Sequence, residues 1–132
     1  MKKGETDIGI LLRSMNPLLH EGEYVFCLLE GNINIDISHV LGSFKEEEGI
    51  TIVVEKRVAD EMKLTYSFVS SWITLQVHSS MEAVGLTAAF SRALSDAGIS
   101  CNVIAAFYHD HIFVPVNDKL RAMETLTRLS QY

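Results

Sequence analysis

The run His109-Asp110-His111 places two imidazoles and one carboxylate within three residues. These side chains are common zinc ligands, so a metal site is one interpretation. The spacing argues against it, because residues on either side of a tight turn point apart. No third histidine or cysteine ligand is placed nearby, although His78 could approach across a sheet. The other interpretation is a turn in which Asp110 bonds its own backbone. We prefer the turn and expect neither a metal nor a cofactor.

The two cysteines, Cys27 and Cys101, lie inside apolar runs and form no CxxC motif. We expect both to be buried thiols rather than a disulfide. A nucleophilic Cys or Ser needs a histidine base within hydrogen-bond reach. Cys101 and His78 are a conceivable pair, but no third partner is visible and the chain has no glycine-rich phosphate loop. We therefore expect no catalytic residues, and the chain is not expected to be an enzyme.

The bulk composition excludes several classes of partner. The 132 residues carry a formal net charge of −6, which removes the long-range attraction to phosphate that nucleic-acid binding requires. Lys2 and Lys3 are followed by acidic residues, and the apolar stretch ends at Arg13, so a signal peptide is not expected. No apolar run approaches the roughly 20 residues that span a bilayer. With 48% hydrophobic residues, we expect a globular cytoplasmic protein that binds neither nucleic acid nor membrane.

The C-terminal half has clear periodicity. Apolar and polar residues alternate from Trp72 to Val77, which predicts a half-buried strand. A helix capped by Ser79 or Ser80 follows, and Gly98 is placed to end it. The remaining predicted elements are strands at Val103–Tyr108 and His111–Val116, joined by a tight turn at His109-Asp110, and a helix from Lys119 to about Leu129 capped by Asp118.

The N-terminal half is less regular. Apolar residues from Ile8 predict a helix that ends before Asn16, because Pro17 cannot continue it, with a turn after it. A helix is also expected from Asp36 or Ser38 to the acidic run that Gly49 closes, although acid at a helix C-terminus opposes the helix dipole. The other predicted elements are strands at Tyr24–Leu29 and Ile50–Val54 and a further edge strand within Val58–Val69.

The order of elements from Trp72 is strand, helix, strand, strand, helix, which is a split βαβ unit without its last strand. The N-terminal half is the obvious donor of that strand. A weak repeat supports two related units, since Tyr24 precedes Gly49 by about 25 residues and Trp72 precedes Gly98 by about 26. We predict an α+β, ferredoxin-like βαββαβ sandwich with an antiparallel sheet and helices on one face. Its two tandem units are a degenerate one at 1–68 and a second at 69–132.

The segment from Val77 to Val116 is similar to the ACT domain, and specifically resembles small bacterial ACT proteins of uncharacterised function. The resemblance extends through NPLLHEGEYVFC and EEEGITIVVE in the N-terminal half. Similar domains regulate aspartokinase and serve as arginine sensors. The resemblance therefore implies a regulatory module that binds a small molecule, an amino acid above all.

The resemblance also implies a position for the ligand. In ACT domains a Gly-Leu pair stands between the first strand and the first helix, and the ligand lies against that loop and the second strand of a neighbouring unit. A glycine at a helix start admits close approach, and free N–H groups there favour a carboxylate. Asn102 can donate and accept, while Asp110 or Glu82 could pair with an α-amino group. The implied ligand-binding residues are Ser79, Ser80, Glu82, Gly85, Leu86, Asn102, Val103 and Asp110.

Structural roles compete with this interpretation. Ser79 and Ser80 could serve only as helix caps, Gly85 only for packing, and Asn102 only as a turn residue. The chain also departs from many ACT domains, which carry Asp-Arg/Lys-Pro where His78 and the two serines stand. The alternative function is a non-catalytic oligomerisation or protein-interaction module with a vestigial pocket. In either case we expect a homodimer or a higher homo-oligomer, because pairing would cover a sheet edge and a helix flank.

Overall fold

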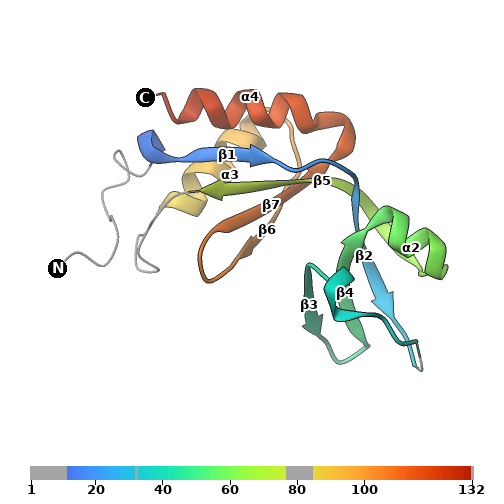
Figure 1. Ribbon diagram of the computed structural model, residues 1–132. Coiled ribbons are helices and arrows are strands. Elements are labelled where there is room, and N and C mark those ends of the chain that lie inside the picture. Colours follow the sequence, from blue (N-terminus) through green and yellow to red (C-terminus); the bar gives the residue numbers. More distant parts are fainter. Residues whose placement is uncertain (1–11, 32, 77–84, 132) are drawn as a thin grey trace. The chain divides into compact units, whose positions relative to one another are not determined.

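The computed structural model describes residues 12–31, 33–76 and 85–131, which form two compact units (Figure 1). The central unit is Glu21–Ser71, and the C-terminal unit combines Met1–His20 with Trp72–Tyr132. The chain thus passes between the units twice, after His20 and before Trp72. The long strand β5 (Tyr66–Gln76) gives its first part to the central unit and its last part to the C-terminal unit.

The C-terminal unit contains the complete strand set of a ferredoxin-like fold. Its strand order is β1-β5-β7-β6, with antiparallel pairing of β1 to β5 and of β6 to β7. Strand β1 is therefore the missing last strand, which confirms that the N-terminal half donates it. The elements are β1 (Asn16–Leu19), α3 (Leu86–Asp96), β6 (Asn102–Ala105), β7 (Asp110–Pro115), a short 3-10 helix η2 (Val116–Asp118) and α4 (Lys119–Leu129).

Both helices of this unit cover one face of its strands. Alternate residues of β5 and β7 point into a core that α3 and α4 close, as expected for strands with one covered face. The fully buried residues include Ile73 and Leu75 on β5, Ile112 and Val114 on β7, Phe90 and Leu94 on α3, and Ala122 and Leu126 on α4. The opposite face of β5 carries Trp72, Thr74 and Gln76.

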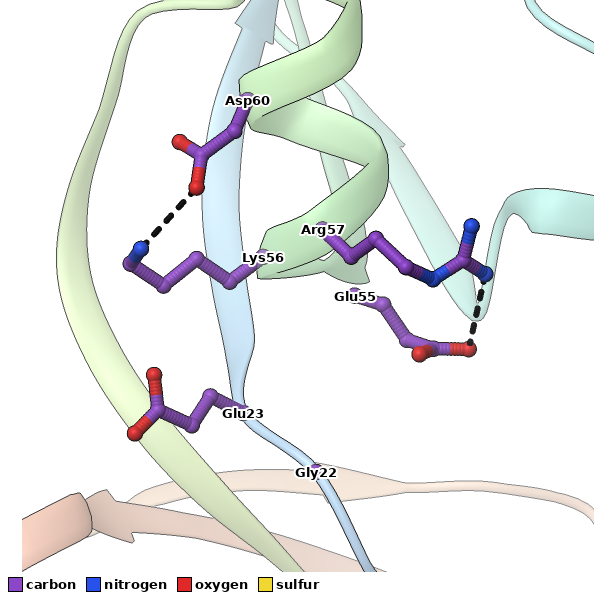
Figure 2. Close-up of a pocket in the computed structure, with 6 residues that line it drawn as sticks. All are labelled: Gly22, Glu23, Glu55, Lys56, Arg57 and Asp60. Atoms are coloured by element: carbon purple, nitrogen blue, oxygen red, sulfur yellow. Dashed lines mark hydrogen bonds and ion pairs between the residues drawn. The ribbon is translucent and has the colours of Figure 1, made fainter.

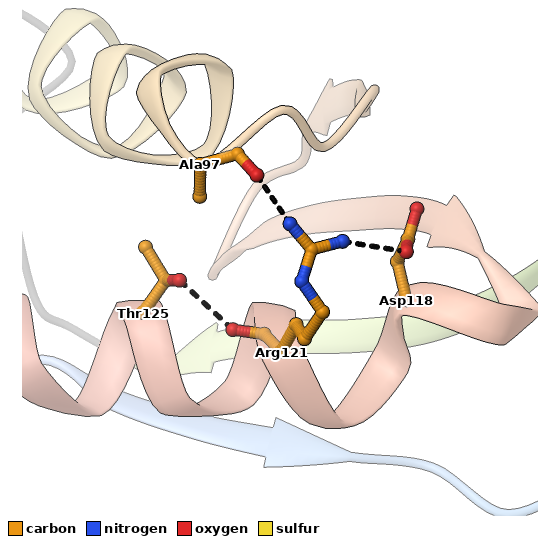
Figure 3. Close-up of polar contacts among 4 residues, drawn as sticks. All are labelled: Ala97, Asp118, Arg121 and Thr125. Carbon is orange, nitrogen blue, oxygen red and sulfur yellow. Dashed lines mark hydrogen bonds and ion pairs between the residues drawn. The ribbon is translucent and has the colours of Figure 1, made fainter.

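The predicted end of α3 is confirmed. Gly98 has a φ of +75°, and the Ile99 N–H donates to the Leu94 carbonyl at 2.9 Å, so the last turn is closed by a Schellman-type bond. Arg121 on α4 adds to this closure, because its guanidinium donates both to the Ala97 carbonyl and to Asp118 at 2.8 Å (Figure 3). A cation at a helix C-terminus also interacts favourably with the helix dipole. The two helices are thereby tied together at one end.

The central unit repeats the same strand order with fewer helices. It contains β2 (Tyr24–Leu29), β3 (Gly42–Lys45), β4 (Ile50–Glu55), helix α2 (Lys56–Met62) and the first part of β5, in the order β3-β4-β2-β5. The predicted strands at Tyr24–Leu29 and Ile50–Val54 are confirmed. Its core consists of Val25, Cys27, Ile52, Val54, Val58, Ala59 and Leu64. Between β2 and β3 the described residues form only a three-residue 3-10 helix, η1 (Ile37–His39).

The helix expected from Asp36 or Ser38 to Glu48 is wrong. Asp36 caps the short η1 by accepting from the Ser38 N–H at 2.9 Å, and the chain then enters β3. The acidic run forms a turn, in which the Glu46 N–H donates to the Gly49 carbonyl at 2.9 Å. A helix ending in three acids would oppose its own dipole, whereas antiparallel pairing with β4 satisfies the backbone of β3.

One further N-terminal expectation is wrong, and another is met in part. Asn16–Leu19 forms β1 instead of a turn, because Pro17 is tolerated in a strand at the edge of its unit. The strand expected within Val58–Val69 is present as the start of β5, but it is not an edge strand, and the unpredicted helix α2 precedes it. Helix α2 ends at Lys63, whose φ of +56° is the left-handed conformation of a helix C-cap.

The hairpin between β6 and β7 turns two residues earlier than predicted. Ala105 pairs with Asp110, and the Ala106 N–H donates to the His109 carbonyl at 3.0 Å, so the turn lies at Phe107-Tyr108. This register keeps Ile112 and Val114 on the helix-covered face, and a shift of one residue would reverse that.

The start of α3 also differs from the prediction. The helix begins at Leu86 with Gly85 as its N-cap, so neither Ser79 nor Ser80 caps it, and both serines lie outside the described residues.

Candidate functional site

Gly85 occupies the N-cap position of α3 with a φ of +103°, a conformation that favours glycine over other residues. The first backbone N–H groups of a helix have no partner within it, and the positive end of the helix dipole attracts anions. No side chain caps this end among the described residues. Gly85 itself supplies no side-chain cap to the first N–H groups of α3.

Leu86 and Val103 contribute to the core of the C-terminal unit. The Leu86 side chain is only 4% exposed and packs with α3 and α4, while Val103 packs against the same cluster from β6. Neither side chain is free to wrap a ligand without leaving the core. Any contact with a ligand at these two positions is expected through the backbone.

Asn102 and Asp110 lie at opposite ends of the β6–β7 hairpin. Asn102 is exposed and pairs with Phe113, whereas Asp110 pairs with Ala105, three rungs away. Three residues of strand correspond to about 10 Å. Burial raises the pKa of the Asp110 carboxyl, and the neighbouring histidines partly oppose this. One unit therefore does not bring Asn102 and Asp110 to the same ligand.

Three of the predicted site residues, Ser79, Ser80 and Glu82, lie outside the described residues. Among the remaining five, Gly85 supplies backbone and Asn102 and Asp110 supply accessible polar groups.

A charged cleft of about 340 Å³ lies in the central unit beside α2 (Figure 2). Lys56 pairs with Asp60 at 2.9 Å, and Arg57 lies 3.8 Å from Glu55. Figure 2 draws no ion pair for Glu23. Acidic and basic side chains both line the cleft, which suits a zwitterionic ligand. All of these charged side chains are accessible to solvent. The lining residues are Gly22, Glu23, Glu55, Lys56, Arg57 and Asp60.

No sequence motif predicts this cleft. The only indication of it in the sequence is the mixture of acidic and basic residues at positions 55–61, which is also typical of an ordinary solvent-exposed helix face.

A second cleft of about 280 Å³ lies where β2 and β5 change register near Cys27. The Cys27 side chain is 2% exposed, and burial raises the pKa of its thiol to about 11. The prediction of a buried thiol is confirmed for Cys27. Cys101 is only half-buried, and burial raises the pKa of its thiol as well. Such thiols are poor nucleophiles, because the thiolate is the reactive form.

A cluster of four hydrogen-bonded side chains in the C-terminal unit is likewise not predicted by any sequence motif. His20, Trp72, Thr74 and His111 meet on the face of the C-terminal unit that α3 and α4 leave uncovered. The Thr74 hydroxyl lies 2.7 Å from His20 Nε2 and 3.0 Å from His111 Nδ1, and the Trp72 Nε1–H donates to the same Nδ1 at 3.1 Å. The His20 and Trp72 rings stack at 3.5 Å.

These contacts bear on the metal hypothesis for the His109-Asp110-His111 run. Nδ1 of His111 is occupied by Trp72, and in the described residues no three potential ligands gather to hold a metal ion.

Comparison with known families agrees with this architecture. Residues 3–71 match one ACT domain model, and residues 67–128 match a second one. The chain belongs to the ACT domain family. The predicted ferredoxin-like fold with two tandem ACT units is thereby confirmed. ACT domains are, in general, regulatory modules that bind small ligands.

Solved structures give the same fold. A Vibrio cholerae protein of unknown function, described as a possible transport protein, is 46% identical over 94% of this chain and 96% of its own, with a TM-score of 0.84. An Agrobacterium tumefaciens protein is 18% identical over 88% and 89% of the two chains, with a TM-score of 0.69. A putative C-terminal regulatory domain of aspartate kinase from Porphyromonas gingivalis is 15% identical over 89% and 98%, with a TM-score of 0.59.

The search among curated proteins finds no match. In the described part of the chain, no helix is both long and apolar enough to cross a bilayer.

Proposed function

We propose that this protein is a non-catalytic cytoplasmic sensor whose ACT units bind an amino acid. The support is the match of both halves to ACT domains, together with the left-handed Gly85 that opens the start of α3. The ligand carboxylate would accept from backbone N–H groups at this helix start. Its α-amino group would pair with an acidic side chain, Asp110 or Glu82.

The site is completed by a second copy of the chain in this proposal. Asn102 lies at the far end of the β6–β7 hairpin from Asp110, so one unit cannot present both to one amino acid. Asn102 and the backbone of Val103 from a neighbouring unit would meet the ligand instead. Binding would then change the association of two copies, which is how a ligand signal would reach a partner.

A protein-interaction module is the second candidate function. It is favoured by apolar side chains that remain exposed, such as Phe107 at 90% and Tyr108 at 79% on the hairpin tip and Ile37 at 84% on η1. Exposed aromatic residues are typical of protein contacts. In this alternative the start of α3 binds nothing, and dimerisation persists without a ligand.

The test is a thermal-shift titration of the purified protein with each of the twenty amino acids. A ligand present at 100 times its Kd stabilises the native state by about 2.7 kcal/mol. The sensor proposal expects a dose-dependent rise in Tm with one amino acid or a few related ones. Light scattering with and without that amino acid reports the oligomeric state.

Matched glycine variants locate the site. Gly85→Asp should abolish the ligand-induced shift, because it places a carboxylate at the helix start. Gly31→Asp is the control, since Gly31 also has a positive φ of +55° and a Cβ there meets nothing within 4 Å. A shift that survives Gly85→Asp but disappears in Glu23→Gln would place the ligand in the α2 cleft and refute the site at α3. A flat screen with intact dimers would favour the interaction module.

A further inference from the structure

The group formed by His20, Trp72, Thr74 and His111 stands at both chain crossings between the units. His20 is the last residue before the central unit, and Trp72 is the first residue after it. The two are held together by the ring stack at 3.5 Å and by a backbone bond, in which the His20 N–H donates to the Trp72 carbonyl at 2.9 Å. The two chain segments that lead into and out of the central unit are therefore joined at the stacked residues His20 and Trp72.

The hydrogen bonds of this group have a defined direction. An indole N–H can only donate, so Nδ1 of His111 must accept from Trp72 and carries no proton. The neutral His111 ring then has its proton on Nε2. The Thr74 hydroxyl donates to the same Nδ1 at 3.0 Å and accepts from His20 Nε2–H at 2.7 Å. The chain of bonds links β1, β5 and β7.

The two histidines respond differently to a proton. A proton added to Nδ1 of His20 leaves its bond to Thr74 intact and places a cation against the indole face, which is favourable. When Nδ1 of His111 is protonated, it becomes a donor like the Trp72 Nε1–H that it accepted from. The hydrogen bond from Trp72 is therefore lost. Thr74 must also reverse its role towards His111.

We propose that His20, Trp72, Thr74 and His111 form a protonation-sensitive clasp, which holds the two chain crossings together while His111 is neutral and releases them when His111 takes a second proton. This inference rests on the proposed function, and the clasp gives that sensor a response to acid. Because β1 ends next to His20 and, within the described residues, pairs with β5 alone, release of the clasp weakens the attachment of this strand.

The surrounding charges act on this equilibrium in known directions. Burial lowers the pKa of both His20 and His111 from their ordinary value of 6.5. His111 lowers that of His20, His109 lowers that of His111, and Asp110 opposes the latter shift. Strands β1, β5 and β6 contain no charged residue, and Glu21 follows His20 in the chain.

The pH dependence follows from these directions. Because the folded pKa values are depressed, the unfolded chain binds protons more readily as the pH falls. The contribution of the clasp to stability is therefore complete above pH 6.5 and is lost as the pH falls through the lower folded values.

The experiment uses Trp72, which is the single tryptophan of the chain. Its emission maximum is followed from pH 8 to pH 5, together with the amide exchange protection of His20, whose N–H bonds the Trp72 carbonyl. We expect a red shift with a midpoint below 6.5. We also expect the His20 protection factor to fall over the same pH range.

Three variants separate the clasp from general acid effects. His111→Gln offers an acceptor to Trp72 but does not titrate, so the amide protection of His20 should stay constant over this range, although His20 itself still titrates against the indole. Asp110→Asn removes the carboxylate that favours protonated His111 and should move the midpoint to lower pH. His39→Gln, in the exposed η1, is the matched control and should behave as the wild type.

The proposal fails if the wild-type emission is flat, or if the amide protection of His20 falls in His111→Gln as it does in the wild type. Nitrogen NMR of the unmodified protein at pH 7.5 gives a test that needs no variant. Nδ1 of His111 must be unprotonated, and a proton found on that nitrogen would overturn the clasp.

Discussion

The two units share one strand order but differ in how their sheets are covered. In the C-terminal unit, α3 and α4 close a core that includes Phe90, Leu94 and Leu126. In the central unit, α2 is the one α-helix in the described residues, and the short η1 stands where the first crossover helix would be. Its core is built from smaller side chains, chiefly valine, isoleucine, cysteine and alanine.

From this difference we expect the two units to have different roles. A ligand site of the expected type needs a helix start beside the first strand, and the C-terminal unit has one at Gly85. The central unit has no such helix between β2 and β3 among its described residues. We therefore expect ligand binding in the C-terminal unit and a supporting role for the central unit, which still supplies the charged cleft beside α2.

Removal of Phe90 gives the largest expected effect. Its side chain is fully buried at the centre of the α3 face, so Phe90→Ala should lower the free energy of unfolding by about 3–5 kcal/mol. Chemical denaturation monitored by circular dichroism measures this loss. Phe107→Ala is the matched control, because Phe107 is 90% exposed and its loss should change the stability by less than about 0.5 kcal/mol.

The two cysteines can report on the two units separately. Cys27 belongs to the central unit and Cys101 to the C-terminal unit. Cys27 is buried with a thiol pKa of about 11, so at pH 8 only roughly one molecule in a thousand carries its thiolate. We expect a thiol reagent to modify Cys101 first and Cys27 only after the central unit opens.

Comparison of this labelling in wild type and Phe90→Ala sharpens the contrast between the units. If they unfold independently, the substitution accelerates modification of Cys101 and leaves Cys27 protected. Equal acceleration at both cysteines would show that the two units unfold as one, contrary to our expectation.

Much of the fold could be predicted from local sequence patterns. Tyr24–Leu29 and Ile50–Val54 are short apolar runs with clear ends, the helix from Lys119 follows Asp118, and each of these elements is present. The errors occur where pairing overrides local preference. Phe44 and its neighbours have an ambiguous pattern, and only β4 beside them makes them a strand. Pro17 is similarly a strand residue because β1 pairs with β5, where Pro17 lies opposite Leu75.

The candidate site was less accessible to sequence reasoning. Gly85 could be singled out because it stands in a Gly-Leu pair typical of ACT domains. The histidine group could not, because His20 and His111 are 91 positions apart in the numbering and meet only when β1, β5 and β7 are neighbours. His20 has no local motif, and the His109-Asp110-His111 run around His111 indicates a turn or a metal site rather than contact with His20.

Two adjacent serines at the end of the central unit provide the finest test of the comparison. Both are buried, but the Ser70 hydroxyl donates to the Tyr24 carbonyl at 2.8 Å, whereas the Ser71 hydroxyl has no partner in the described structure. Loss of a satisfied hydrogen bond costs about 1 kcal/mol, while removal of an unsatisfied buried group is neutral or favourable. Ser70→Ala should therefore lower the Tm, and Ser71→Ala should leave it unchanged or raise it. A lower Tm for Ser71→Ala would mean that its hydroxyl has a partner in solution, such as a buried water beside Trp72, and that the crossing is held by more than the clasp.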